Sequence, residues 1–168
     1  MRKLVLFAVF GFGIAACAQS KVDLAAGWDF NHADQGNGFA DLNGWWASAT
    51  YNLSSKVGLG FINQNYYGSY RGISQNQHAY MAGPTFTFRN EQRKVRPYIQ
   101  PVIGDVRSSY AGSVSNNFGV QIAAGFVVKM GQKLGLNISP AQYAYVRQNG
   151  MNLNSYQAAV GLQLSLGK

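Results

Sequence analysis

The chain has 168 residues, enough for one domain, and 47% of them are hydrophobic although the mean hydropathy is only −0.11. This mixture excludes a helical membrane protein with several spans, but it suits a soluble globule or a barrel whose strands alternate apolar and polar residues. Charged residues make up 12%, about half the usual share of a soluble domain. The formal net charge is +8. The basic residues are scattered rather than clustered, which argues against nucleic-acid binding, and attraction to anionic lipid headgroups is a simpler use for them.

Residues 1–18 have the three parts of a secretory signal peptide. A short basic start precedes an apolar run over 4–16, which is too short for a comfortable membrane span. Small residues follow, so we predict cleavage after Ala18 and a mature domain over 19–168. The same segment also resembles a lipobox, in which Cys17 would be lipidated instead. Cys17 is the only cysteine, so cleavage after Ala18 leaves no disulfide and no thiol.

From Val22 onward, large apolar residues alternate with small or polar ones. In the first run, over 22–30, the apolar residues share one face and Asp23 and Asp29 share the other. A wet lumen would spare these aspartates the cost of a dry core, while the apolar face would meet lipid. The same alternation predicts seven further strands, at 45–53, 57–62, 80–89, 96–104, 118–129, 134–139 and 156–166.

Short and long connections alternate between these predicted strands. Short polar turns are expected at 53–56, 90–94 and 130–133. Longer loops rich in Gly, Ser and Asn are expected at 32–41, 67–77, 107–117 and 148–154. This rhythm predicts an all-β fold: an eight-stranded antiparallel up-and-down transmembrane β-barrel with short periplasmic turns.

Aromatic residues concentrate toward the ends of the predicted strands. Amphipathic rings favour the headgroup depth of a membrane, so rings near both ends would sit at both interfaces. We predict an aromatic girdle formed by Trp28, Trp45, Tyr51, Phe86, Phe88, Phe118, Phe126 and Tyr156.

The hairpin rhythm, the Pro97-Tyr98 pair and a last strand over 156–166 that carries a glycine among alternating apolar residues resemble the small outer-membrane barrel family typified by OmpA and OmpX. The resemblance covers all of the mature chain. It implies a monomer in the bacterial outer membrane, surrounded by lipid and lipopolysaccharide and inserted by the barrel-insertion machinery.

The inward-facing charges are the main candidates for a site in the lumen. An eight-stranded barrel is nearly filled by its own side chains, so charges inside it should pair. The alternation points six charged residues inward: Asp23, Asp29, Arg89, Arg96, Lys129 and Arg147. We predict a lumen charge network of Asp23 and Asp29 with Arg96 and Arg147, serving either as packing or as a gate for small solutes.

Two histidines are the candidates for chemistry. His32 falls in the first predicted long loop and His78 opens the strand after the second, so both should lie near the extracellular rim, where they could approach each other or Ser74. Neither has the His-x-Ser spacing that a lipid A deacylase-like barrel would use, since Tyr80 stands two residues after His78. Two distant histidines also make a poor zinc site. We predict no catalytic residue, no metal site and no cofactor.

These features predict a barrel with a structural, adhesive or narrow-channel role and no catalysis. The Tyr, Ser, Gly and Asn content of 66–71 and 108–112 suits an adhesive or glycan-contacting surface. Two alternatives stay open: a lipid-modifying barrel enzyme of the lipid A deacylase kind, and a soluble lipocalin-type barrel with a ligand inside. The second would need an apolar interior and a polar exterior, the reverse of the pattern found here.

Overall fold

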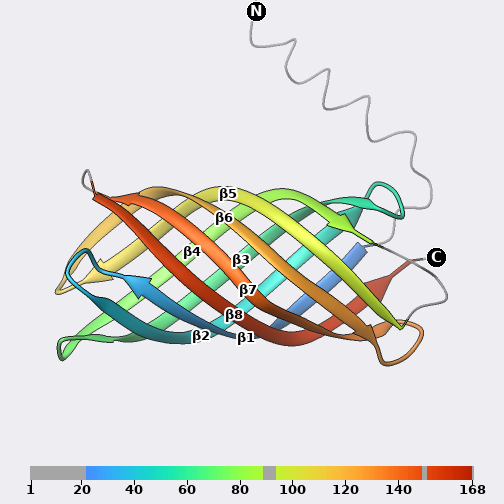
Figure 1. Ribbon diagram of the computed structural model, residues 1–168, viewed down its shortest axis with the longest axis horizontal. Coiled ribbons are helices and arrows are strands. Elements are labelled where there is room, and N and C mark those ends of the chain that lie inside the picture. Colours follow the sequence, from blue (N-terminus) through green and yellow to red (C-terminus); the bar gives the residue numbers. More distant parts are fainter. Residues whose placement is uncertain (1–21, 89–93, 149–150, 168) are drawn as a thin grey trace, which may run out of the picture.

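The computed structural model describes residues 22–88, 94–148 and 151–167, which form a closed barrel of antiparallel strands paired in chain order (Figure 1). The strands are β1 (Val22–Asp34), β2 (Phe39–Asn52), β3 (Val57–Tyr70), β4 (Ile73–Thr87), β5 (Val95–Tyr110), β6 (Ser113–Lys129), β7 (Leu134–Gln148) and β8 (Met151–Leu166). Because β8 also pairs with β1, the sheet has no open edge. The predicted eight-stranded up-and-down barrel is confirmed. The predicted signal peptide lies outside the described residues.

The two ends of the barrel differ. Val22 pairs with Leu166, so β1 begins and β8 ends at the same end of the barrel, together with the turns over 53–56 and 130–133. We call this the terminal end. The opposite end, which we call the hairpin end, carries the connections over 35–38, 71–72 and 111–112.

The wall separates two kinds of side chain, as the alternation predicts. On β1, Asp23 and Asp29 point inward and are buried, whereas Leu24 and Trp28 point outward and are exposed. Exposed large apolar side chains occur on the outer face of all eight strands. Large apolar side chains that point outward, around a lumen that holds buried polar side chains, are the arrangement of a barrel in lipid and the inverse of a water-soluble one. No helix in the described parts of the chain is long and apolar enough to cross a membrane.

The predictions of long loops are wrong, because the strands continue through them. β3 and β4 meet at Arg71 and Gly72, and β5 and β6 meet at Ala111 and Gly112. All four residues have positive φ, between 49° and 79°, which is the type I′ geometry that joins twisted strands most tightly. Only 35–38 separate β1 from β2, and β7 and β8 extend to Gln148 and from Met151. The predicted short turns at 53–56 and 130–133 are confirmed, while 90–94 falls mostly outside the described residues.

A β-bulge in β7 changes which residues face inward. The register of β7 against β8 shifts between Ser139 and Gln142, where one extra residue is inserted. Before the bulge the buried positions are odd-numbered, and after it they are even-numbered, as at Gln142 and Val146. The predicted inward orientation of Arg147 is therefore wrong: it is exposed on the outer face.

Candidate functional site

The centre of the lumen is filled by hydrogen-bonded amides around one carboxylate. Asp29 of β1 is fully buried, and its Oδ2 accepts hydrogen bonds from the Tyr66 hydroxyl at 2.8 Å and from Gln64 Nε2 at 3.0 Å. Both donors come from β3, two residues apart on the same inward face. The side-chain partners of the carboxylate are thus neutral groups, both on β3.

Three more glutamines extend this network across the barrel. Gln64 Nε2 lies 3.3 Å from Oε1 of both Gln142 and Gln157. Gln121 Nε2 donates to the same two oxygens, at 2.5 and 3.1 Å. The network links β1, β3, β6, β7 and β8, and we call it the glutamine plug: Asp29, Gln64, Tyr66, Gln121, Gln142 and Gln157.

The plug separates two spaces in the lumen. On its terminal side is a cavity of about 60 Å³, and near the hairpin end is a cleft of about 20 Å³. The two have no lining residue in common. An apolar cluster adds to the filling of the lumen: Ile62, Ala79, Met81, Val102, Val106 and Val146.

The cavity on the terminal side is polar and has room for a few water molecules. Four residues that line it each carry a buried polar atom without a hydrogen-bond partner among the described residues: Trp46 Nε1, Gln64 Oε1, Thr85 Oγ1 and Gln100 Nε2. Buried donors without a partner are costly, so water is the natural partner for them here. We therefore regard this half of the lumen as hydrated.

The predicted lumen charge network is not assembled as expected. Asp23 and Arg96 both line the cavity, and Asp23 accepts hydrogen bonds from Asn52 at 2.8 Å and from Ser165 at 2.5 Å. Asp29 lies in the plug with neutral partners, and Arg147 lies outside the barrel. The prediction is therefore wrong for Asp29 and Arg147. Of the other inward charges predicted, Arg89 lies outside the described residues.

Sequence reasoning missed the glutamines that close the lumen. Gln64, Gln121 and Gln157 each stand at an inward position of the alternating pattern, and that position was the available signal. The prediction considered only inward charges, and an uncharged amide gives no electrostatic reason to expect a partner. Gln142 lies beyond the bulge, where the alternation no longer indicates the inward face.

The residues predicted for an aromatic girdle all point away from the lumen. Six are exposed, from 43% for Phe86 to 61% for Phe88 and Phe118, and Tyr51 and Phe126 are half-buried. Their placement at the headgroup depth of a membrane stays a prediction.

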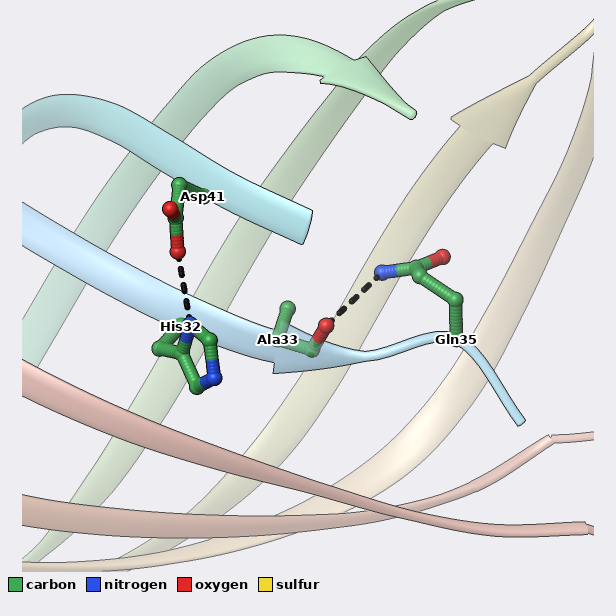
Figure 2. Close-up of polar contacts among 4 residues, drawn as sticks. All are labelled: His32, Ala33, Gln35 and Asp41. Atoms are coloured by element: carbon green, nitrogen blue, oxygen red, sulfur yellow. Dashed lines mark hydrogen bonds and ion pairs between the residues drawn. The ribbon is translucent and has the colours of Figure 1, made fainter. Parts of the chain in front are cut away.

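The two histidines lie on the outer wall, inside strands rather than in or beside loops. His32 of β1 places Nδ1 2.6 Å from Oδ1 of Asp41 on β2 (Figure 2). The ring of His32 also stacks on Phe39, with centroids 4.5 Å apart and planes within 8°. Since an ionised carboxylate only accepts hydrogen bonds, Nδ1 donates the proton, and Nε2 faces away from Asp41.

His78 of β4 has a separate environment. Its Nδ1 lies 2.6 Å from Asn65 Oδ1 on β3, and its ring meets Tyr67 edge-on. Two strands, β2 and β3, stand between the histidines, so the structure does not bring them together. Ser74 is four residues before His78 on β4, about 13 Å along the strand, and is no partner for it. In the described ranges no group of three or more His, Cys, Asp or Glu could hold a metal ion.

No protein-family model matches the chain, and no curated protein matches it. Solved structures do match. Neisserial surface protein A has a TM-score of 0.72 and 18% identity over 86% of this chain and 96% of its own. Ail, the attachment invasion locus protein of Yersinia pestis, has a TM-score of 0.60 and 12% identity over 88% of this chain and 99% of its own. The outer-membrane enzyme PagL has a TM-score of 0.54 and 13% identity over 84% and 98%. The chain therefore has the fold of the small outer-membrane barrels, and the resemblance inferred from the sequence is confirmed at the level of fold.

Proposed function

We propose that this chain is an integral protein of the bacterial outer membrane that conducts no solutes and acts through its outer surface, in a structural or adhesive role. The observation that carries the proposal is an apolar outer wall around a lumen closed by the glutamine plug. Export by the signal peptide over 1–18, insertion by the barrel-insertion machinery, and a monomer surrounded by lipopolysaccharide belong to the same proposal.

The height of the apolar wall supports a membrane location. On β8 the outward residues from Tyr156 to Leu166 are apolar without interruption, and Val160, Leu162 and Leu164 are 40–53% exposed. Ten residues of rise are about 33 Å along a strand, or about 25 Å along the axis of a barrel whose strands tilt by roughly 40°. That length matches the apolar band of outer-membrane barrels, about 25 Å.

The closed lumen favours a surface role over a narrow channel. The cavity lies on the terminal side of the plug and the cleft lies near the hairpin end. A solute would have to break the hydrogen bonds among Gln64, Gln121, Gln142 and Gln157 to pass. The exposed apolar side chains on the outer face of every strand also argue against a lipocalin-type barrel, which needs a polar exterior.

An enzyme is the second candidate, because His32 and Asp41 form a base with an orienting carboxylate and PagL shares the fold. In the part of the chain that the structure describes, the side chain of His32 contacts Asp41 and Phe39, and neither supplies the hydroxyl or thiol that a histidine base activates. The proposal therefore assigns no catalysis. If the purified protein released acyl chains from lipid A, and if His32→Ala abolished this activity, an enzymatic function would replace the proposed surface role.

Cell fractionation combined with gel mobility tests the membrane location. We expect the protein in the outer-membrane fraction, with different mobility before and after boiling, since a closed barrel resists detergent until heated. Planar-bilayer recordings of the same preparation should show no conductance steps. A soluble periplasmic protein without a mobility shift would contradict the proposal.

A further inference from the structure

The cavity on the terminal side of the plug continues toward the end of the barrel. Three residues line both this cavity and a smaller cleft of about 10 Å³ beside the turn over 130–133: Arg96, Val127 and Gln163. We call the cavity and this cleft together the terminal pocket. Its inner end is closed by the glutamine plug, because Gln64 and Gln142 bond each other and also form part of the cavity wall. A molecule that enters from the terminal end can therefore bind in the pocket, but it cannot pass through.

The inner part of the terminal pocket offers both donors and an acceptor of hydrogen bonds. The four buried atoms without a partner among the described residues are the donors Trp46 Nε1 and Gln100 Nε2, the acceptor Gln64 Oε1, and the Thr85 hydroxyl, which can do both. Their side chains are at most 8% exposed, so bulk solvent does not reach them freely. A ligand that fills this space must therefore accept and donate hydrogen bonds.

Two of these polar atoms lie close together beside Gly60 of β3. A Cβ atom added at Gly60 would lie 2.3 Å from Gln100 Nε2 and 3.0 Å from Thr85 Oγ1, and the Thr50 hydroxyl would be 3.3 Å away. One amide and two hydroxyls thus converge on a point of the wall where any other residue would place its side chain. The glycine keeps this part of the pocket polar.

The outer part of the terminal pocket is basic. Arg96 lies where the cavity meets the cleft, and Lys129 and Lys133 line the cleft. These cations attract an anion into the opening, and the five N–H donors of a guanidinium group can bind a carboxylate together with other partners. One acidic residue, Asp23, also lines the cavity. Its charge disfavours a second carboxylate nearby, so the pocket suits a monoanion.

We propose that the terminal pocket binds a small hydroxycarboxylate of about three carbons, with its carboxylate toward Arg96 and its hydroxyl groups inward, toward Gln100 and Trp46. The size agrees, because an ordered water needs about 10–15 Å³ and the cavity of about 60 Å³ therefore holds about four to six atoms of that size. The ligand's oxygens would take the places of water. This site goes beyond the proposed surface role.

Other small ligands match the inner polar atoms less well. A hydroxyl group both donates and accepts, so it can serve the donors and the acceptor of the pocket together. An ammonium group only donates, so an amino acid would leave Trp46 Nε1 and Gln100 Nε2 without partners. An inorganic anion without a proton only accepts, and it would leave Gln64 Oε1 unpaired.

Calorimetric titration of the full mature barrel in a neutral detergent tests the site with glycerate as the probe. We expect saturable binding of glycerate, and binding at least about tenfold weaker for propionate, which lacks the hydroxyls, and for glycerol, which lacks the carboxylate. Trp46→Phe removes one donor from the pocket and should weaken glycerate binding about fivefold to tenfold, the size of one hydrogen bond. The matched control is Trp28→Phe, because Trp28 is 49% exposed on the outer face and should leave the affinity unchanged.

A pair of charge reversals tests the route into the pocket. Lys133→Glu changes the sign of a charge in the cleft and should weaken glycerate binding about twofold to fivefold, less so at high salt. Arg147→Glu changes an exposed cation on the outer face instead and should leave the affinity unchanged. Equal effects of the two variants would contradict entry from the terminal end.

Three results would overturn the inference. The first is a folded wild type, with its heat-dependent mobility shift, that shows no saturable binding of glycerate. The second is equal binding of propionate or glycerol, which would remove the recognition of hydroxyls or of the carboxylate. The third is unchanged affinity in Trp46→Phe, or in Thr85→Val where the first variant does not fold. Because the pocket is tested in detergent, a protein that is absent from the outer-membrane fraction refutes the proposed function alone.

Discussion

The glutamine plug and the cavity on its terminal side are built from the same kinds of side chain, yet they satisfy their polar atoms differently. In the plug, Gln64 and Gln121 donate to shared oxygens, and the buried atoms left without a partner among the described residues are acceptors such as Asp29 Oδ1. In the cavity, the atoms left over include the donors Trp46 Nε1 and Gln100 Nε2.

This difference decides where water can stand in the barrel. Donors that point into open space bind water, whereas the plug amides bond one another, and two of them, Gln64 and Gln142, form part of the cavity wall. The lumen is therefore closed at one layer and hydrated at another. The plug crosses the lumen, and the apolar cluster described above adds to its closure.

The largest effect is expected from removing the amides that cross the lumen. The double variant Gln64→Ala/Gln121→Ala deletes both shared donors of the plug, so water can join the cavity to the cleft. We expect conductance steps in planar bilayers where the wild type shows none. The control Thr85→Ala/Gln100→Ala alters only the cavity and should stay silent. Conductance in both variants, or in neither, would show that the plug is not the barrier.

The two buried aspartates of β1 should differ in what they contribute to stability. Asp29→Ala leaves the Tyr66 hydroxyl and Gln64 Nε2 without their shared acceptor in a dry layer, and we expect a loss of about 3 kcal/mol in unfolding free energy. Asp23→Ala should lose only about 1 kcal/mol, because water in the cavity can replace the carboxylate for Asn52 and Ser165. Urea unfolding in vesicles measures both. Equal losses would contradict the contrast between dry plug and wet cavity.

Two tyrosines give a smaller version of the same comparison. Tyr66 donates to the Asp29 carboxylate at 2.8 Å, and Tyr98, which lines the cavity, donates to the neutral Asn137 at 2.9 Å. Tyr66 is 1% exposed, whereas water in the cavity can replace the bond of Tyr98, so Tyr66→Phe should cost about 2 kcal/mol and Tyr98→Phe about 1 kcal/mol or less. The same unfolding assay measures both. A larger loss for Tyr98→Phe would place the dry layer on the terminal side instead.

The inner and outer faces of the wall could be predicted from sequence as far as the strands stay regular. The orientations of Asp29 and Trp28 follow from a side-chain period of two, which is local. The prediction failed at Arg147 because the bulge after Ser139 inserts one residue and exchanges the faces. Pro140 lies at this bulge, but the other three prolines stand in β4 and β5 without a register shift, so proline alone does not locate it.

The strand ends at the hairpin end and the contacts of the plug could not be predicted from the sequence. A polar segment rich in Gly, Ser and Asn can form either a loop or a strand with water on its outer face, and its composition does not tell which. In the structure, the tight turns at Gly72 and Gly112 show that the segments around them are strands. The plug depends on bringing Gln64 to Gln121, Gln142 and Gln157 across the lumen. These four glutamines lie on four strands, β3, β6, β7 and β8, so the contact depends on how the strands pair around the barrel and not on any one of them.

The smallest change in unfolding free energy is expected where water serves as the hydrogen-bond partner of the group that is removed. Thr85 Oγ1 is buried in the cavity wall without a partner among the described residues, and Thr85→Val keeps its shape while removing the hydroxyl. If water solvates that hydroxyl, its loss is nearly balanced by the gain of an apolar methyl group, and the unfolding free energy should change by less than about 0.5 kcal/mol. Had the hydroxyl been dry and unsatisfied, the valine would stabilise the barrel by about 1 kcal/mol or more. The sign and size of this one change therefore distinguish a hydrated cavity from an empty one.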